Sequence, residues 1–256
     1  MIFLRTIVVF LLFSNFLFSQ ESKIKTEEAQ PETILFIGNS YLYYGDSLHN
    51  HFRRMVEEYF TGYDASSVKS ATIGGSRLKH HNVERLIKPK AISSIEKFDL
   101  VILQGGSGET LTVDSRKEFS YFVKKHVQTI RENNSQAALY MTHAYVKPHK
   151  KFTENQIKTI AETYTKVGIE NQALVIPVGL AFDLAYQKQP NIRLHKSDGS
   201  HPSLLGTYLA ACTVFSSIYR ESPIGLKYDY FGKINEKDKM FLQEIAEKAT
   251  SMFFNK

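Results

Sequence analysis

The chain has 256 residues, of which 43% are hydrophobic and 23% charged, a globular composition that excludes disordered and collagen-like chains. A single cysteine, Cys212, excludes an intramolecular disulfide and therefore a small disulfide-stapled secreted scaffold. The formal net charge of +6 comes from 32 basic and 26 acidic residues, an excess too small to indicate nucleic-acid binding.

The first residues have the pattern of an export signal. Arg5 precedes an apolar run over residues 6–18, and the small residue Ser19 follows it. A membrane span needs roughly 20 apolar residues, more than this run contains. We therefore predict a signal peptide over residues 1–19, a flexible leader over residues 20–31, and an exported bacterial protein, periplasmic or extracellular, with no membrane span once the signal is cleaved. An uncleaved N-terminal anchor is the alternative.

From residue 32 onward, short apolar runs alternate with helical patterns. The predicted strands are Thr33–Ile37, Ser67–Ala71, Asp99–Leu103, Ala137–Met141 and Leu174–Val178. The predicted helices are Ser47–Phe60, a less regular stretch near Val83–Ile95, Asp114–Arg131, Glu154–Glu170, Leu180–Gln187, Pro202–Tyr219 and Glu236–Phe254. Strands without polar alternation suit a sheet covered on both faces, and strand–helix alternation indicates parallel strands. We find no internal linker, so residues 32–256 are predicted to form one doubly wound α/β domain.

Capping residues indicate where several helices begin. Asp46 precedes the first predicted helix, and Asn235 precedes the last. Thr153 with Gln156 three residues later has the spacing of a capping box.

In a doubly wound sheet, ligands bind beyond the carboxyl ends of the strands. The first predicted strand runs directly into Gly38-Asn39-Ser40-Tyr41, which places Ser40 at such an end. A serine there is a candidate nucleophile, and a turn or N-cap role is the alternative. Gly74 and Gly75 follow the second strand, where backbone N–H groups without side chains in front of them suit an oxyanion hole, although an ordinary tight turn has the same sequence.

The last candidate motif is Asp198-Gly-Ser-His201, just before an apolar helix. A carboxylate three residues before a histidine can bind one imidazole nitrogen and leave the other to accept a proton from a hydroxyl group. The alternative is that Asp198 and Ser200 merely cap the helix that follows.

Together, Gly38-Asn39-Ser40, Gly75 and Asp198-x-x-His201 resemble the sequence blocks of the SGNH (GDSL-type) hydrolase superfamily, over about Thr33 to Tyr219. The resemblance implies a flavodoxin-like three-layer α/β/α sandwich with a five-stranded parallel sheet. It also implies a cofactor-free serine hydrolase in which Ser40 is the nucleophile, His201 the general base and Asp198 its partner. The backbone N–H groups of Ser40 and Gly75 would bind the oxyanion.

The chain departs from the superfamily in its third block, where an asparagine usually supplies an oxyanion donor. Here the third strand ends in Gln104-Gly-Gly-Ser107-Gly-Glu109, without an asparagine, which resembles a bacterial subgroup that lacks it. Gln104, Ser107 or a backbone N–H of the glycine run is the expected replacement. Ser107 among glycines also resembles the nucleophile elbow of α/β-hydrolases, but Glu109 replaces the last glycine and no convincing helix follows at once.

Other polar residues at the strand ends are candidate pocket residues. Tyr41, His81 and His143 are predicted to line the substrate pocket; Tyr43 and Tyr44 are further candidates, with loop packing as the alternative. We predict no metal site, because the paired histidines have no carboxylate or cysteine at ligand spacing.

These features predict an exported serine esterase acting on acyl esters, acetyl esters in particular, of a small molecule or a glycan. An O-acyltransferase with the same three residues and a non-catalytic glycan-binding domain are the alternatives.

Overall fold

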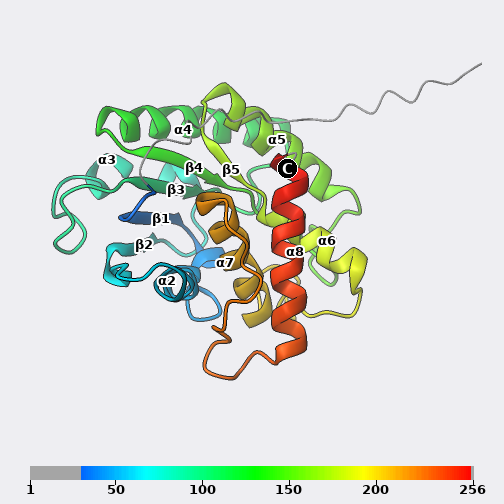
Figure 1. The fold of residues 1–256 in the computed structure, drawn as a ribbon. Helices are drawn as coiled ribbons and strands as arrows, with labels where there is room; N and C mark the ends of the chain where they lie inside the picture. Colours follow the sequence, from blue (N-terminus) through cyan, green and yellow to red (C-terminus); the bar gives the residue numbers. More distant parts are fainter. Residues whose placement is uncertain (1–29, 255–256) are drawn as a thin grey trace, which may run out of the picture.

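Five parallel strands form one sheet in the order β2-β1-β3-β4-β5 (Figure 1). The strands of this computed structural model are β1 (Ile34–Gly38), β2 (Val68–Thr72), β3 (Leu100–Gln104), β4 (Gln136–Tyr140) and β5 (Leu174–Ile176). The structure describes residues 30–254, so the predicted signal peptide and most of the predicted leader lie outside the described residues. The chain leaves β1 for the edge strand β2 and crosses back to β3, which is the switch in strand order that a doubly wound fold requires.

Helices cover both faces of the sheet, and each face has its own apolar core (Figure 1). Strand residues alternate between the two cores: Ile34 and Phe36 pack with one, and Leu35 and Ile37 with the other. Helices α2 (Leu48–Tyr59), α6 (Val178–Lys188), α7 (Leu204–Tyr219) and α8 (Glu236–Phe254) cover the first face. Helices α3 (Val83–Leu86), α4 (Val113–Glu132) and α5 (Gln156–Glu170) cover the second. The predicted three-layer α/β/α sandwich is confirmed.

Two short segments differ from the predicted elements. The helix expected near residues 83–95 is only the four-residue α3, because Pro89 disfavours helical conformation in the residue before it and turns follow. Conversely, residues 40–43, expected in a loop, form a single helical turn, α1 (Ser40–Tyr43). Two 3₁₀ turns, η1 (Ala65–Ser67) and η2 (Leu78–His80), flank β2.

Of the three predicted caps, one is confirmed and two are wrong. Asn235 Oδ1 accepts the N–H of Asp238, 2.9 Å away. Asp46 does not cap α2, because Ser47 stands at the N-cap position with φ 63° and no side-chain cap. Helix α5 begins at Gln156, and the Gln156 side chain accepts the N–H of Tyr145 instead of closing a capping box with Thr153.

Helix α7 is buried nearly all round, between the sheet and α8 (Figure 1). This explains why its sequence, which includes the buried thiol of Cys212, is apolar on every side. None of the described helices combines the length and hydrophobicity that crossing a membrane requires.

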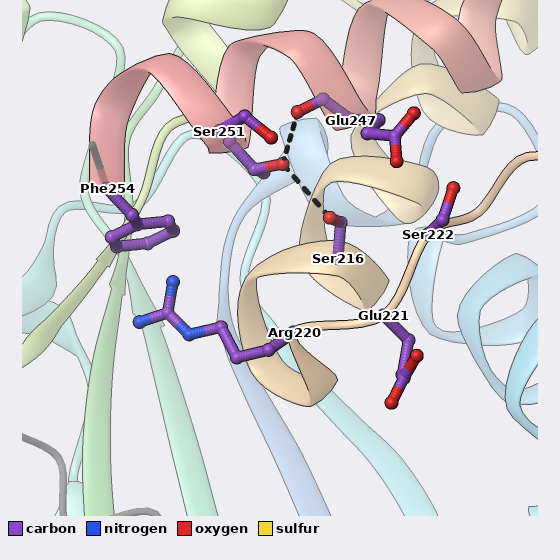
Figure 2. A pocket seen from close by; sticks show the side chains of 8 residues that line it. Ser216, Arg220, Glu221, Ser222, Glu247, Ser251 and Phe254 are labelled. Atoms are coloured by element: carbon purple, nitrogen blue, oxygen red, sulfur yellow. Dashed lines mark hydrogen bonds between the residues drawn. The ribbon is translucent and has the colours of Figure 1, made fainter. Parts of the chain in front are cut away.

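A small polar pocket of about 150 Å³ lies where the carboxyl ends of α7 and α8 meet (Figure 2). Arg220 lies over the ring of Phe254 there, 3.6 Å from its centroid, and the Ser216 and Thr250 hydroxyls are 3.0 Å apart. Because α7 is 16 residues long, this pocket is about 24 Å from the strand ends at which α7 begins. It is therefore separate from the residues that the sequence singles out.

Candidate active site

Asn39 fixes the turn that carries Ser40. Its Oδ1 accepts the N–H of Tyr41 at 3.0 Å, its Nδ2 donates to the carbonyl of Ser76 at 2.9 Å, and its own N–H donates to Gln104 Oε1 at 2.8 Å. Gly38 precedes this turn because a Cβ there would collide with the Gln104 side chain. Ser40 is therefore held as the first residue of α1, directly beyond the carboxyl end of β1.

Ser40, His201 and Asp198 form one continuous hydrogen-bonded line. Ser40 Oγ lies 2.9 Å from His201 Nε2, and His201 Nδ1 lies 2.6 Å from Asp198 Oδ2. A carboxylate can only accept, so Nδ1 carries the proton and Nε2 is the acceptor of the Ser40 hydroxyl. The structure thus brings Ser40 to His201, which is 161 positions away in the chain, and Asp198 to the same ring from 3 positions away.

Asp198 also binds the backbone of its own loop. Its Oδ1 accepts the N–H groups of Ser200 and His201 at 2.9 and 3.0 Å. Burial acts to raise the pKa of Asp198, but hydrogen bonds from the His201 ring and the two N–H groups lower it to about 2. Ser203, not Asp198 or Ser200, caps α7 by accepting the N–H of Gly206. The helix-capping interpretation of Asp198 is therefore wrong.

Aromatic rings hold the imidazole of His201 in place. Tyr44 stacks on it with centroids 4.2 Å apart and planes 25° apart, and Tyr41 meets it edge-on at 6.1 Å. The exposed ring of Tyr43 stacks in turn on Tyr44, with centroids 5.5 Å apart. Of the three tyrosines after Ser40, Tyr43 and Tyr44 are therefore the ones that reach solvent.

Two backbone N–H groups beside Ser40 are candidates to bind an oxyanion. The N–H of Ser40 has no acceptor within its own helix, because Ser40 is the first residue of α1. Gly75 is exposed, has φ +66°, and faces open space where a side chain would begin. The loop that carries Gly75 is tied to β1 by the Ile73 N–H, which donates to the carbonyl of Gly38 at 3.0 Å.

The two side chains expected to replace the missing asparagine both have partners within the protein. Gln104 is 1% exposed, and its amide accepts the Asn39 N–H and donates to the carbonyl of Gly105. Ser107 Oγ accepts the hydroxyl of Tyr145 at 2.8 Å. The Gln104 amide is therefore taken up within the protein, which corrects our expectation of an oxyanion donor at Gln104. Ser107 Oγ is engaged by Tyr145 as an acceptor, and its role as a donor stays a prediction. Ser107 also has a tyrosine instead of a histidine as its partner, which removes the basis for treating it as a nucleophile.

Tyr41, His81 and His143 support the site from beneath instead of lining it, because all three are at most 5% exposed. The Tyr41 hydroxyl lies 3.1 Å from Ser200 Oγ, and its ring stacks on His143 at 4.1 Å. His143 Nε2 donates to the carbonyl of Ser200, and burial lowers the pKa of His143 well below its usual value. His81 Nε2 lies 2.8 Å from Ser76 Oγ. The prediction that these three line the pocket is wrong.

Within residues 30–254, no three His, Cys, Asp or Glu side chains gather closely enough to hold a metal ion. His51 is buried between the carbonyl of Gly45 and the hydroxyl of Tyr228, at 2.6 and 3.1 Å.

Glu109 is a buried carboxyl group that our sequence analysis did not identify as functional. It is fully buried, and its Oε2 accepts the N–H of Gly106 in the loop after β3. Burial raises the pKa of Glu109 to about 7, against the opposing effect of the Gly106 and Leu78 N–H groups. Because Leu78 belongs to the loop after β2, the carboxyl group joins the two loops that border Ser40.

This raised pKa predicts a stability change with pH. The folded protein holds the Glu109 proton up to about pH 7, whereas the unfolded chain releases it near the ordinary glutamate value of 4.5. The free energy of unfolding should therefore fall between these two pH values, on the order of 3 kcal/mol in total. Glu109→Gln should abolish the fall in urea titrations, and Glu162→Gln, at an exposed glutamate of α5, should retain it. An identical pH dependence in wild type and Glu109→Gln would contradict this.

Comparison with known proteins gives similarity at the level of structure. No family model matches the chain, and no curated protein matches its sequence. A DUF4886 family protein from Bacteroides uniformis is 21% identical with a TM-score of 0.66, covering 85% of this chain and 93% of its own. A protein from Slackia heliotrinireducens, proposed to be an SGNH hydrolase, is 22% identical with a TM-score of 0.55, covering 72% and 97%. An acetylxylan esterase from Geobacillus stearothermophilus is 14% identical with a TM-score of 0.54, covering 75% and 95%. These similarities establish a shared fold.

Proposed function

We propose that this chain, which has the fold of the SGNH hydrolases, is a serine esterase with Ser40 as nucleophile. The observation that carries the proposal is the 2.9 Å distance between Ser40 Oγ and His201 Nε2, with Asp198 on the other ring nitrogen. A hydroxyl, an imidazole and a carboxylate in this order are the arrangement that activates a serine for acyl transfer.

The proposed reaction has two halves. Ser40 Oγ attacks the acyl carbonyl while His201 Nε2 takes its proton, and Asp198 stabilises the imidazolium that forms. His201 then gives this proton to the departing alcohol oxygen, which leaves an acyl group on Ser40. In the second half, water loses a proton to His201 and attacks the acyl carbon, and the proton returns to Ser40 Oγ as the carboxylic acid departs.

The Ser40 and Gly75 N–H groups are the proposed oxyanion donors. Both are backbone groups, and the φ of +66° at Gly75 suits glycine better than any other residue. Because the Gln104 amide is taken up within the protein and Ser107 Oγ is engaged by Tyr145, the proposed oxyanion hole relies on backbone donors.

The acyl group is proposed to be acetyl, carried by a carbohydrate, and the enzyme is proposed to act outside the cytoplasm. Acetylxylan esterases among the structures with the same fold support the first point. The basic and apolar pattern of residues 1–19 supports the second.

A fluorophosphonate, which reacts with activated serines, tests the proposal directly. We expect one covalent adduct on wild-type protein by intact mass, located at Ser40 by peptide mapping. Ser107→Ala, the matched control with another strand-end serine removed, should be labelled like wild type, and Ser40→Ala should not be labelled. Labelling that persists in Ser40→Ala would refute the assignment, and release of acetate from acetylated xylan would establish the substrate class.

A further inference from the structure

Unpaired lysines gather on one side of Ser40, in the loops after β4 and before α7. Within residues 30–254, none of them has a carboxylate oxygen within ion-pairing distance, and all are exposed: Lys147, Lys150, Lys151 and Lys196. By contrast, Arg77 and Lys79, in the loop after β2, share the carboxylate of Glu118 at 2.9 Å each.

Lys196 is tied directly to the reacting residues. Its ammonium group lies 4.7 Å from the ring centroid of Tyr44, and the same ring stacks on His201. Its backbone N–H donates to the carbonyl of His201 at 2.8 Å, so the loop geometry fixes where Lys196 emerges. One tyrosine ring therefore separates this cation from the imidazole.

The other three lysines are carried by residues 147–151, which pack on the Asp198 loop. The N–H of Val146 donates to the carbonyl of Gly199 at 2.9 Å. The Lys151 ammonium lies beside Gly108, within 3.8 Å of where a side chain there would begin. Lysines thus approach the site from the loop that follows β4, where Lys151 lies beside the loop that follows β3, and from the Asp198 loop.

The carboxylates of the site offset only part of this charge. Asp198, with its pKa of about 2, contributes one negative charge against four lysines, and Glu109 is fully buried. His149 contributes no cation near neutral pH, because burial and then Lys151 lower its pKa. The entrance to the site is consequently electropositive, which attracts anions and raises their local concentration.

We propose that the substrate is an acyl ester of an acidic saccharide, whose carboxylate groups meet Lys196 and the lysines of residues 147–151. This inference rests on the proposed esterase function, and it specifies the part of the substrate that leaves as the alcohol. Solvated ammonium groups recognise charge more than shape, so the preference should weaken as salt increases.

The test compares two sugars that differ only in charge: an O-acetylated methyl glucuronoside and its O-acetylated glucuronamide counterpart. Acetate release is followed at low and high salt. Wild-type protein should favour the acid in kcat/KM by about 5- to 10-fold at low salt, with a smaller ratio at high salt. In Lys151→Gln/Lys196→Gln, which removes two of the four lysines, the ratio should fall to about 2- to 3-fold. The control Lys124→Gln/Lys248→Gln removes the same charge from exposed positions on α4 and α8 and should keep the wild-type ratio.

Equal rates on the acid and the amide in wild type, or the same loss of ratio in both double variants, would overturn the inference. Calorimetry of acidic and neutral oligosaccharides binding to Ser40→Ala protein tests the charge preference independently of the esterase proposal. Tighter binding of the acidic sugar without acetate release by wild type would refute the esterase function alone. Equal binding of the two sugars would refute the charge preference whatever the rates.

Discussion

Replacing Ser40 with alanine is expected to lower kcat for p-nitrophenyl acetate by about 10⁵- to 10⁶-fold, the loss typical when a serine nucleophile is removed. The variant keeps the backbone N–H of residue 40 and the Asn39 contacts that shape the turn. The only side-chain hydrogen bond that the described structure shows for Ser40 is the one to His201. The loss should therefore appear in kcat, with little change in the free energy of unfolding.

Ser107→Ala is the matched control for this measurement. Ser107 also follows a strand and a glycine, but its hydroxyl group accepts from Tyr145 and lies outside the Ser40–His201–Asp198 line. We expect less than a tenfold loss in kcat. Comparable activity in Ser40→Ala and wild type, with both proteins folded by circular dichroism, would refute the nucleophile assignment.

Most of the sheet could be predicted from the sequence because, apart from the half-buried edge strand β2, its strands are buried on both faces. Such strands consist of apolar residues without interruption, as in β1 and β3, and helices long enough to show a period separate them. The elements that were missed are short. Helix α1 has four residues, too few for any hydrophobic period, and its formation depends on Gln104 and Ser76, which are distant in sequence.

The same difference between local and long-range contacts decides which site residues could be predicted. Asp198 and His201 could be paired from sequence because they are only three positions apart, so local geometry decides their contact. Whether a polar residue after a strand faces the pocket or the interior depends on packing from other elements. Tyr41 and His143 turned inward because they stack on each other, and His143 also stacks on Phe182 of α6. Glu109 was missed because its burial is decided by the loops around it.

Replacing the carboxylate of Asp198 is expected to have the second large effect on kcat. Asp198→Asn should lower kcat by about 10⁴-fold, because an amide can donate to His201 Nδ1 and so favour the tautomer with the proton on Nε2. In that tautomer Nε2 cannot accept from Ser40. Asp183→Asn is a suitable control, since Asp183 binds only Gln187 on the exposed side of α6 in the described structure.

The pKa of about 2 at Asp198 decides the pH range in which this comparison is informative. A carboxyl group with a lowered pKa contributes stability above its unfolded value of 3.8 and loses that contribution as the pH falls towards 2. Above about pH 5 the wild-type carboxylate is therefore ionised, and any acid limb of kcat/KM there belongs to another group. A loss of less than tenfold in Asp198→Asn near pH 8 would mean that the stacked ring of Tyr44, and not the carboxylate, orients His201. Tyr44→Ala would then show the larger loss.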